Sequence, residues 1–277
     1  IISKSGNTLE TITNFNINFK NKDKNIFITE NTENYLKILA QKLKADVVEH
    51  KNFIGGRFSV LSEVGMLPAQ LMGLSESKFK RFNDLIKKKK FLNDLIQNVL
   101  STYQFTQQKK YNSIILNYDP DSEDLFKWYQ QLVSESLGKN SKGILPIIST
   151  MPKDNHSILQ LYLSGFKSNF YTFYIAEEKN SSKLNSKLLF NEFNFLKQKN
   201  IFDILNAQRI ATENIFRSKK IPFRSFYIKK RDEKTIGELF CFFTLEVILL
   251  SHLLKVNPLD QPEVELVKKE TFKILKK

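Results

Sequence analysis

The sequence predicts an α/β fold in which helices cover both faces of parallel sheets. Segments of strand character alternate with segments of helical period along the chain, and this alternation occurs twice, in residues 1–75 and again in 76–277. With 277 residues and 41% hydrophobic content, the chain is long enough for one large domain or two modest domains with proper cores. We therefore expect two units of similar rhythm, although no repeat is visible at the level of single residues.

The first unit opens with the end of a strand. Ile1 and Ile2 form that strand end, residues 3–8 form a polar turn, and a helix should begin near Thr8. Further along we expect strands at 25–29 and 46–50, a turn at 55–56, and helices at 32–43 and around 68–74. Because a domain rarely begins at the last residues of a core strand, we expect this unit to be incomplete and the chain to be a fragment.

The second unit contains the longer series of predicted elements. Its central helix has Phe126, Tyr129 and Leu132 at helical spacing. It ends before Gly138 and Lys139, because glycine accepts a left-handed turn and lysine suits the negative helix end. Helices within 75–100 should bridge the units; the other expected elements are strands at 111–117, 144–149, 169–175 and 224–229, and helices at 121–136, 154–162, 189–197, 202–218, 233–255 and 262–276.

The longest apolar stretch, residues 236–256, indicates a buried core helix rather than a membrane span, because it carries Glu238, Glu246 and His252. The single cysteine, Cys241, excludes a disulfide framework and fits a reducing cytoplasm. We therefore expect a cytoplasmic protein with no membrane partner.

The chain is strongly basic, with 43 Lys and Arg against 29 Asp and Glu and a net charge of +14. Such a charge can indicate nucleic-acid binding, but the lysines are scattered, and the one dense run, 87–90, fits a solvated helix face. The sequence lacks zinc-ligand spacing, an RNA-binding aromatic motif and a Walker-type loop. We therefore expect no nucleic-acid partner, no metal and no cofactor, and a surface that attracts anions.

Gln131 and Glu135 stand four residues apart near the end of the central helix, so their side chains lie on one face. The negative helix end disfavours the carboxylate and so favours proton uptake, as a general base requires, while the amide can orient a polar ligand. The alternative is a solvated glutamate at a helix end, which by spacing alone is the commoner case.

Residues 3–8, SKSGNT, form a candidate phosphate-binding turn. They offer three hydroxyls, one ammonium and the free N–H groups of a helix N-terminus, and Gly6 allows close backbone approach. From these residues alone, a Ser/Thr-rich helix cap is an equally good interpretation.

Two further residues could take part in chemistry. Arg57 follows a glycine pair and could stabilise negative charge that develops on oxygen, or it could tie down a loop through a salt bridge. His156, at the start of a predicted helix, could relay a proton near neutral pH, although an unaccompanied histidine is more often a capping or surface residue. We interpret His50 and His252 as structural.

Five stretches resemble the glucose-6-phosphate isomerase family, in the same order. They are 2–11 (ISKSGNTLET), 55–69 (GGRFSVLSEVGMLPA), 131–139 (QLVSESLGK), 154–165 (DNHSILQLYLSG) and 257–268 (NPLDQPEVELVK). One such match alone would be weak, but five ordered matches over nearly the whole chain are specific. The resemblance implies two sugar-isomerase (SIS) type domains, the first incomplete, and a homodimer with shared active sites.

The resemblance also implies roles for single residues. It assigns the substrate phosphate to Ser3, Lys4, Ser5 and Thr8, the base to Glu135 beside the orienting amide of Gln131, enediolate stabilisation to Arg57, a substrate contact to Gln261, and ring opening to Lys268 and to His156 of the neighbouring subunit. The last stretch departs from the family pattern: Glu263 stands where the family has a small residue, and Val267 replaces the glycine before the lysine.

The expected function is therefore an aldose–ketose isomerase that interconverts glucose 6-phosphate and fructose 6-phosphate through an enediolate. A related isomerase that also accepts mannose 6-phosphate is the nearest enzymatic alternative. A non-catalytic module that binds sugar phosphates would keep the turn at 3–8 without needing Glu135, Arg57 and His156 together.

Overall fold

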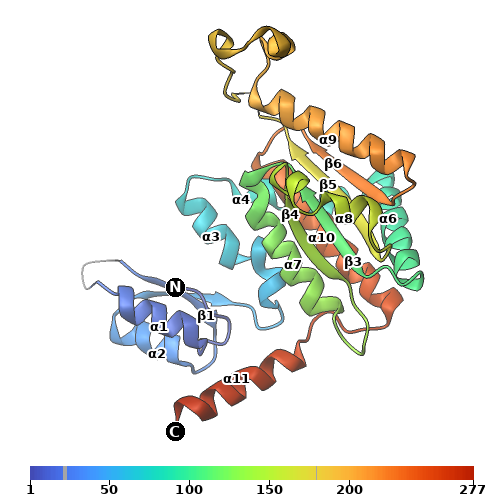
Figure 1. Cartoon of the computed structure of the whole chain (residues 1–277). Coiled ribbons are helices and arrows are strands. Elements are labelled where there is room, and N and C mark those ends of the chain that lie inside the picture. The colour runs from blue at the N-terminus through green and yellow to red at the C-terminus, as the bar shows by residue number, and fades with distance from the viewer. Residues whose placement is uncertain (21–23, 179) are drawn as a thin grey trace.

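The computed structural model describes residues 1–20, 24–178 and 180–277 and contains two parallel sheets (Figure 1). The smaller sheet pairs β1 (Ile26–Glu30) with β2 (Asp46–His50), and the larger has the strand order β4-β3-β5-β6. Every described strand pair is parallel, and helices connect the strands. The predicted α/β class is therefore confirmed.

The smaller sheet is covered by α1 (Leu9–Asn18) and α2 (Tyr35–Lys42). Phe27 of β1 is fully buried; it packs with α2, and its ring lies 5.5 Å from the ring of Phe15 on α1. Ile2 forms a parallel bridge with Ile28, so the opening residues lie beside β1 as the end of a strand would.

The larger sheet has β5 near its centre, buried along its whole length because helices lie on both of its faces. Successive side chains of a strand point to opposite faces, so Ile115 of β3 joins one core while Ile114 and Leu116 join the other. The strands of this sheet are β3 (Asn112–Asn117), β4 (Leu145–Thr150), β5 (Asn169–Ala176) and β6 (Phe223–Ile228).

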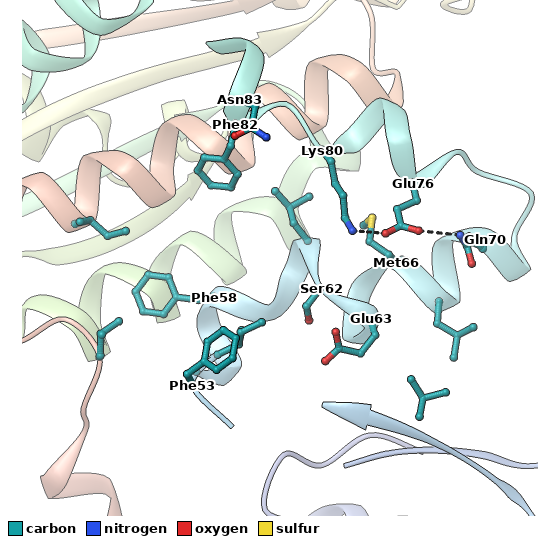
Figure 2. A pocket seen from close by; sticks show the side chains of 17 residues that line it. Phe53, Phe58, Ser62, Glu63, Met66, Gln70, Glu76, Lys80, Phe82 and Asn83 are labelled. Atoms are coloured by element: carbon teal, nitrogen blue, oxygen red, sulfur yellow. Dashed lines mark hydrogen bonds and ion pairs between the residues drawn. The ribbon is translucent and has the colours of Figure 1, made fainter. Parts of the chain in front are cut away.

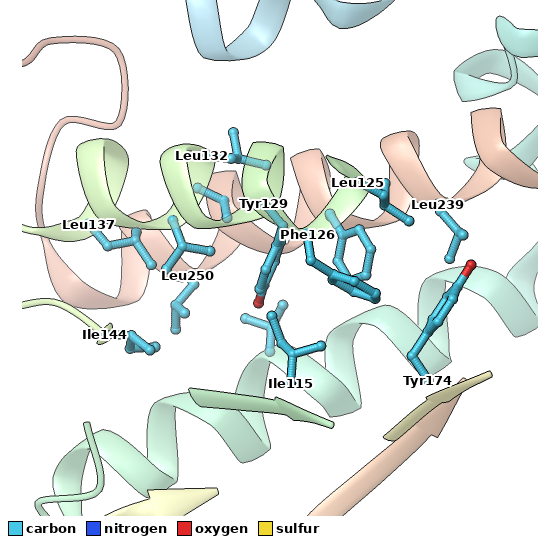
Figure 3. Close-up of a cluster of buried hydrophobic side chains, with 14 of the residues drawn as sticks. Ile115, Leu125, Phe126, Tyr129, Leu132, Leu137, Ile144, Tyr174, Leu239 and Leu250 are labelled. Atoms are coloured by element: carbon cyan, nitrogen blue, oxygen red, sulfur yellow. The ribbon is translucent and has the colours of Figure 1, made fainter. Parts of the chain in front are cut away.

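One core lies between this sheet and three helices; Figure 3 shows Phe126 and Tyr129 among its side chains, together with Ile115 of β3 and Tyr174 of β5. The other core joins the opposite face to two helices, where the ring of Phe216 packs edge-on against Phe173. The helices of the first core are α6 (Lys89–Gln107), α7 (Glu123–Leu137) and α10 (Glu233–Leu254); those of the second are α8 (Leu159–Ser164) and α9 (Ile201–Ser218).

By length and composition alone α10 could cross a membrane, but in the structure it lines the first core. Glu246 on α10 is only 2% exposed, and its carboxylate pairs with Arg224 of β6 and accepts a hydrogen bond from the Tyr129 hydroxyl at 3.2 Å. Asn98 of α6 also donates to Glu246. The Glu246 carboxylate therefore has partners inside the protein, and the apolar side chains of α10 pack in the first core. The prediction of a buried core helix is confirmed.

Some predicted boundaries were wrong. The helix expected around 68–74 is α3 (Glu63–Leu71), which begins earlier because the Ser62 hydroxyl caps it and the helix accommodates Pro68 in its interior. In place of the helix expected at 189–197 lies the 3₁₀-helix η5 (Asn191–Leu196), preceded by a second 3₁₀-helix, η4 (Ser186–Leu188). Neither buries a residue, so a regular helix would gain no packing energy here.

Two other predicted helices are divided. The segment 121–136 starts with the 3₁₀-helix η2 (Pro120–Ser122) before α7, and the segment 154–162 contains η3 (Lys153–His156) followed by α8. Between the units lie the single-turn helices α4 (Glu76–Phe79) and α5 (Phe82–Leu85), which lead into α6. The terminal helix α11 (Pro262–Leu275) has no buried residue and extends away from the second unit (Figure 1).

Gly6→Ala should lower the free energy of unfolding by about 1–3 kcal/mol. Gly6 has φ +66°, and an added Cβ would lie 1.8 Å from Oδ1 of Asn34, the side chain that caps α2. Denaturant unfolding measures the loss. Gly73→Ala is the matched control, because Gly73 has φ +80° with no atom within 4 Å of the added Cβ. Equal losses in the two variants would show that contact with Asn34 does not matter.

Buried His50 holds the loop that follows β2. Its Nε2 donates to the Ile54 carbonyl at 3.1 Å, and its Nδ1 pairs with the Glu63 carboxylate. Burial opposes ionisation of Glu63, but hydrogen bonds from its own backbone, from His50 and from the Lys51 backbone outweigh burial and lower the pKa of Glu63.

The lowered pKa of Glu63 predicts a loss of stability in acid. The contribution of ionised Glu63 to the free energy of unfolding is fully present above the ordinary glutamate pKa of 4.5. It is lost as the pH falls through the lower pKa that Glu63 has in the folded state. Glu63→Gln should therefore be less stable than wild type at neutral pH and should lose less stability below pH 4.5. Thermal unfolding from about pH 7 to about pH 3 measures this. Exposed Glu265→Gln is the control, and an identical pH profile for wild type and Glu63→Gln would contradict the prediction.

Candidate functional site

The centre of the candidate site is the guanidinium of Arg57, whose side chain is only 1% exposed. Arg57 belongs to the 3₁₀-helix η1 (Gly56–Leu61). Its Nε donates to Ser136 Oγ at 2.8 Å, and its Nη1 donates to Glu135 Oε2 at 3.0 Å and to Gln261 Oε1 at 2.8 Å. Its Nη2 donates to two backbone carbonyls, those of Pro258 and of Asp260.

Burial lowers the pKa of Arg57, and the carboxylates of Glu135 and Asp260 oppose that shift. The guanidinium is thus a desolvated positive charge whose donors are bound on several sides. Arg57 forms a salt bridge, as one of the two interpretations from the sequence expected. Stabilisation of negative charge that develops on oxygen stays a prediction.

Two hydrogen bonds hold the backbone at Arg57. The indole Nε1 of Trp128 donates to the Arg57 carbonyl at 2.9 Å, and Ser59 Oγ donates to the Gly56 carbonyl at 2.6 Å. Neither preceding glycine has positive φ, and an added Cβ would meet no atom closer than 3.6 Å at Gly55 and none within 4 Å at Gly56. Backbone geometry within this chain therefore does not require the glycine pair.

Glu135 and Gln131 lie on one face of α7, as predicted. Gln131 Nε2 donates to Glu135 Oε1 at 2.9 Å, while the other carboxylate oxygen accepts from Arg57. The Glu135 side chain is 27% exposed, so its carboxylate remains accessible from outside although it contacts a buried guanidinium.

The structure brings four predicted residues into contact: Gln131, Glu135, Arg57 and Gln261. The sequence analysis missed Ser136, although it lies in the same matched stretch, next to Glu135. It also missed the carbonyls of Pro258 and Asp260, since a backbone carbonyl carries no residue-type signal. A hollow of about 530 Å³ is lined by Lys139, Asn257 and Asp260 among others, but Arg57, Glu135 and Gln261 are not among its lining residues.

The predicted phosphate turn belongs to the first unit, and among the described residues no hydrogen bond or ion pair joins it to this cluster. Ser3 and Thr8 face each other through their hydroxyls at 2.7 Å, and the Lys4 ammonium lies 3.5 Å from Glu30. Ser5 Oγ accepts from the Asn7 N–H at 3.4 Å. Thr8 occupies the N-cap of α1 without a side-chain capping bond, which leaves the first-turn N–H groups free of that partner.

His156 and Lys268 are not brought to Arg57 by any hydrogen bond or ion pair among the described residues. His156 is exposed at the end of η3. Lys268 Nζ pairs with Glu265 Oε1 at 2.7 Å on exposed α11. Glu263 and Val267, which depart from the family pattern, are exposed as well, so neither crowds Lys268 within this chain.

A larger hollow of about 850 Å³ lies next to η1 but does not include Arg57 or Glu135 among its lining residues. Figure 2 shows its aromatic walls, Phe53, Phe58 and Phe82, and a polar edge where Glu76 joins Lys80 and Gln70. Its largely apolar lining does not suit a sugar phosphate. Within the described ranges, no cluster of three His, Cys, Asp or Glu residues is arranged to hold a metal ion.

No family model matches the chain. Over its full length it is 32% identical across 294 residues to a protein named glucose-6-phosphate isomerase from Methanocaldococcus jannaschii, of which it covers 71%. It is 33% identical across 303 residues to a protein of the same name from Mycoplasmopsis pulmonis, of which it covers 69%.

Solved structures share the fold. The chain superposes on a hypothetical protein from Thermus thermophilus with a TM-score of 0.88 at 23% identity, covering 99% of this chain and 70% of that one. A glucose-6-phosphate isomerase from Chlamydia trachomatis gives a TM-score of 0.75 at 17% identity, with coverages of 99% and 58%.

Proposed function

This chain belongs to the glucose-6-phosphate isomerase family, and on that premise we propose that it is an aldose–ketose isomerase that interconverts glucose 6-phosphate and fructose 6-phosphate. The observation that carries the proposal is the contact of 3.0 Å between the Glu135 carboxylate and the Arg57 guanidinium, two groups 78 positions apart in the sequence.

The reaction needs a base that moves a proton between C2 and C1 on one face of the open sugar, and a positive group for the enediolate. We assign the base to Glu135 and the positive group to Arg57. Because Arg57 is buried and its donors are already fixed, its charge can act in a low-dielectric site with little reorganisation. The Gln131 amide holds the second oxygen of the base.

The phosphate of the substrate belongs, in this proposal, at the turn formed by Ser3, Lys4, Ser5 and Thr8. The paired hydroxyls of Ser3 and Thr8 and the uncapped N-terminus of α1 support this assignment, because hydroxyl and N–H donors at a helix N-terminus favour an anion. Phosphate binding would supply remote binding energy that orients the sugar against Glu135.

We further assign ring opening to His156 and Lys268, and the substrate contact to Gln261. His156 and Lys268 are exposed in a single chain, which suits residues that complete a site across a subunit interface. We therefore propose a homodimer. Apolar side chains on two protruding segments support it: Leu188, Phe190 and Phe195 near η4 and η5, and Leu266, Val267 and Leu275 on α11.

We propose that the protein acts in the cytoplasm. Its single thiol, Cys241, is free and buried, and burial raises the pKa of that thiol to about 11, so it stays protonated and fits a reducing compartment. In this proposal the basic surface attracts an anionic sugar phosphate, and neither nucleic acid nor membrane is a partner.

Glu135→Gln should reduce kcat for fructose 6-phosphate by at least about 10²-fold with little change in KM, because a general base contributes mainly to the transition state. A coupled assay of glucose 6-phosphate formation measures the rate. Exchange of the C2 proton of glucose 6-phosphate with deuterated solvent, followed by NMR, should be lost in parallel.

The matched control is Glu123→Gln, in the first turn of the same helix, where the carboxylate pairs with exposed Lys127. It should keep the wild-type rate. A wild-type protein that binds sugar phosphates but neither isomerises them nor exchanges the proton would instead be a non-catalytic binding module. Full activity of Glu135→Gln would remove Glu135 from the mechanism.

The homodimer predicts a mass near twice 32.4 kDa for wild type in gel filtration with light scattering. Phe190→Asp with Phe195→Asp should shift the protein towards monomer, since the charges would have to be buried. Ile17→Asp, at an apolar side chain on α1 that is 75% exposed, is the control and should leave the mass unchanged. A wild-type protein that is monomeric at all concentrations would contradict the proposal.

A further inference from the structure

We propose that Lys139 is a positioning residue, which holds the segment 257–261 in the place where that segment fixes the Arg57 side chain. The inference rests on the proposed isomerase function for its kinetic consequence. It gives a role to a lysine that transfers no proton and contacts neither Arg57 nor Glu135 through any hydrogen bond or ion pair in the described ranges.

Lys139 is tied to this segment at two points. Its Nζ lies 2.6 Å from Asp260 Oδ1 and donates to the carbonyl of Asn257. The side chain is only 11% exposed, although it is a lysine at the end of a helix. The hydrogen bond from Lys139 lowers the pKa of Asp260, which shows that the contact favours the ionised carboxylate.

The same segment supplies most of the acceptors of Arg57. Both Nη2 contacts, to the carbonyls of Pro258 and Asp260, come from it, as does the Gln261 contact of Nη1 at 2.8 Å. A backbone carbonyl can aim at a donor only while its backbone is held in place. The direction of the Arg57 guanidinium therefore depends on what holds residues 257–261.

Little else holds that segment. Asn257 bonds within it, through Nδ2 to Asp260 Oδ2 and through Oδ1 to the N–H of Leu259, both at 3.0 Å. Leu259 is 61% exposed, and α11, which follows, has no buried residue. In the described part of the chain, hydrogen bonds from the segment to the rest of the protein, apart from those into α11, go to Arg57 and Lys139.

Lys139 also connects the segment to the base. It follows α7, four residues after Glu135 and three after Ser136, whose hydroxyl accepts from Arg57 Nε. The C-terminal end of α7 thus brings together three groups. They are the base Glu135, the Ser136 hydroxyl that accepts from Arg57, and the Lys139 ammonium that holds the segment with the other acceptors of Arg57. Releasing the segment 257–261 would leave the charge of Arg57 intact, but the guanidinium would point in a different direction relative to Glu135.

The kinetic test is Lys139→Met, which keeps the aliphatic stem and removes the ammonium. We expect kcat to fall by about tenfold to a hundredfold with little change in KM, because misplacement of a fixed group acts mainly on the transition state. Lys139→Arg, which can still donate to both partners, should restore most of the rate. Lys142→Met is the matched control: Lys142 also donates to a backbone carbonyl, that of Leu254, at 2.8 Å, but within the described residues no hydrogen bond or ion pair joins it to 257–261.

A second readout does not depend on activity. Arg57 is buried and should resist modification by phenylglyoxal in wild type and in Lys142→Met, whereas Lys139→Met should expose it to several-fold faster modification, located by peptide mass spectrometry. Asp260→Asn keeps the backbone carbonyl that accepts from Arg57 but removes the carboxylate that pairs with Lys139. It should therefore also lower kcat and speed the modification of Arg57. Its effect should not add to that of Lys139→Met, because the two partners form one contact.

The outcomes separate the two proposals. Wild type without isomerase activity would overturn the proposed function, while the labelling of Arg57 would still decide the role of Lys139. Unchanged kcat together with a protected Arg57 in Lys139→Met would overturn the positioning role. If Lys139→Met does not fold, Asp260→Asn with wild-type kcat and a protected Arg57 would overturn it as well.

Discussion

The burial of the Arg57 guanidinium is the constraint on which the candidate site depends. A charge removed from water is costly unless its donors find partners, and breaking a buried pair costs about 3–5 kcal/mol. The partners of Arg57 come from α7 and from residues 257–261, separated from Arg57 by 79 and about 200 positions. Three distant segments must therefore meet for Arg57 to be buried at all, and their meeting point is the site.

A second buried ion pair shows what is particular about the first. Arg224 and Glu246 join β6 to α10 inside the larger core, where Glu246 also accepts from Tyr129 and Asn98. Burial would lower the pKa of Arg224, but Glu246 and Tyr129 together raise it. The Glu246 side chain is 3% exposed against 27% for Glu135, so the pair of Arg224 and Glu246 can only stabilise the core, whereas a ligand can reach the pair of Arg57 and Glu135.

The parts of the chain that pack least are also those to which the proposal assigns work between subunits. Helix α11 and the segment around η4 and η5 bury no residues, and they carry large apolar side chains on their surfaces. His156 and Lys268 are exposed in the same way. A site divided between a buried centre at Arg57 and accessible groups at the surface fits the proposed completion by a second copy.

The sequence by itself determined the α/β class, because helices alternating with strands allow parallel pairing through crossover connections. It also determined that Gln131 and Glu135 share one face, since helical geometry puts positions four apart side by side. The burial of α10 followed from the sequence as well. These are local regularities, and β2 was predicted with its observed bounds.

Only the tertiary structure decided the loss of a regular helix at 189–197 and the acceptors that hold Arg57. The first depends on whether a helix finds a surface to pack against. The second depends on two carbonyls, at Pro258 and Asp260, and a carbonyl is common to every residue. Which of them faces a guanidinium about 200 positions away is set by the packing of the whole chain.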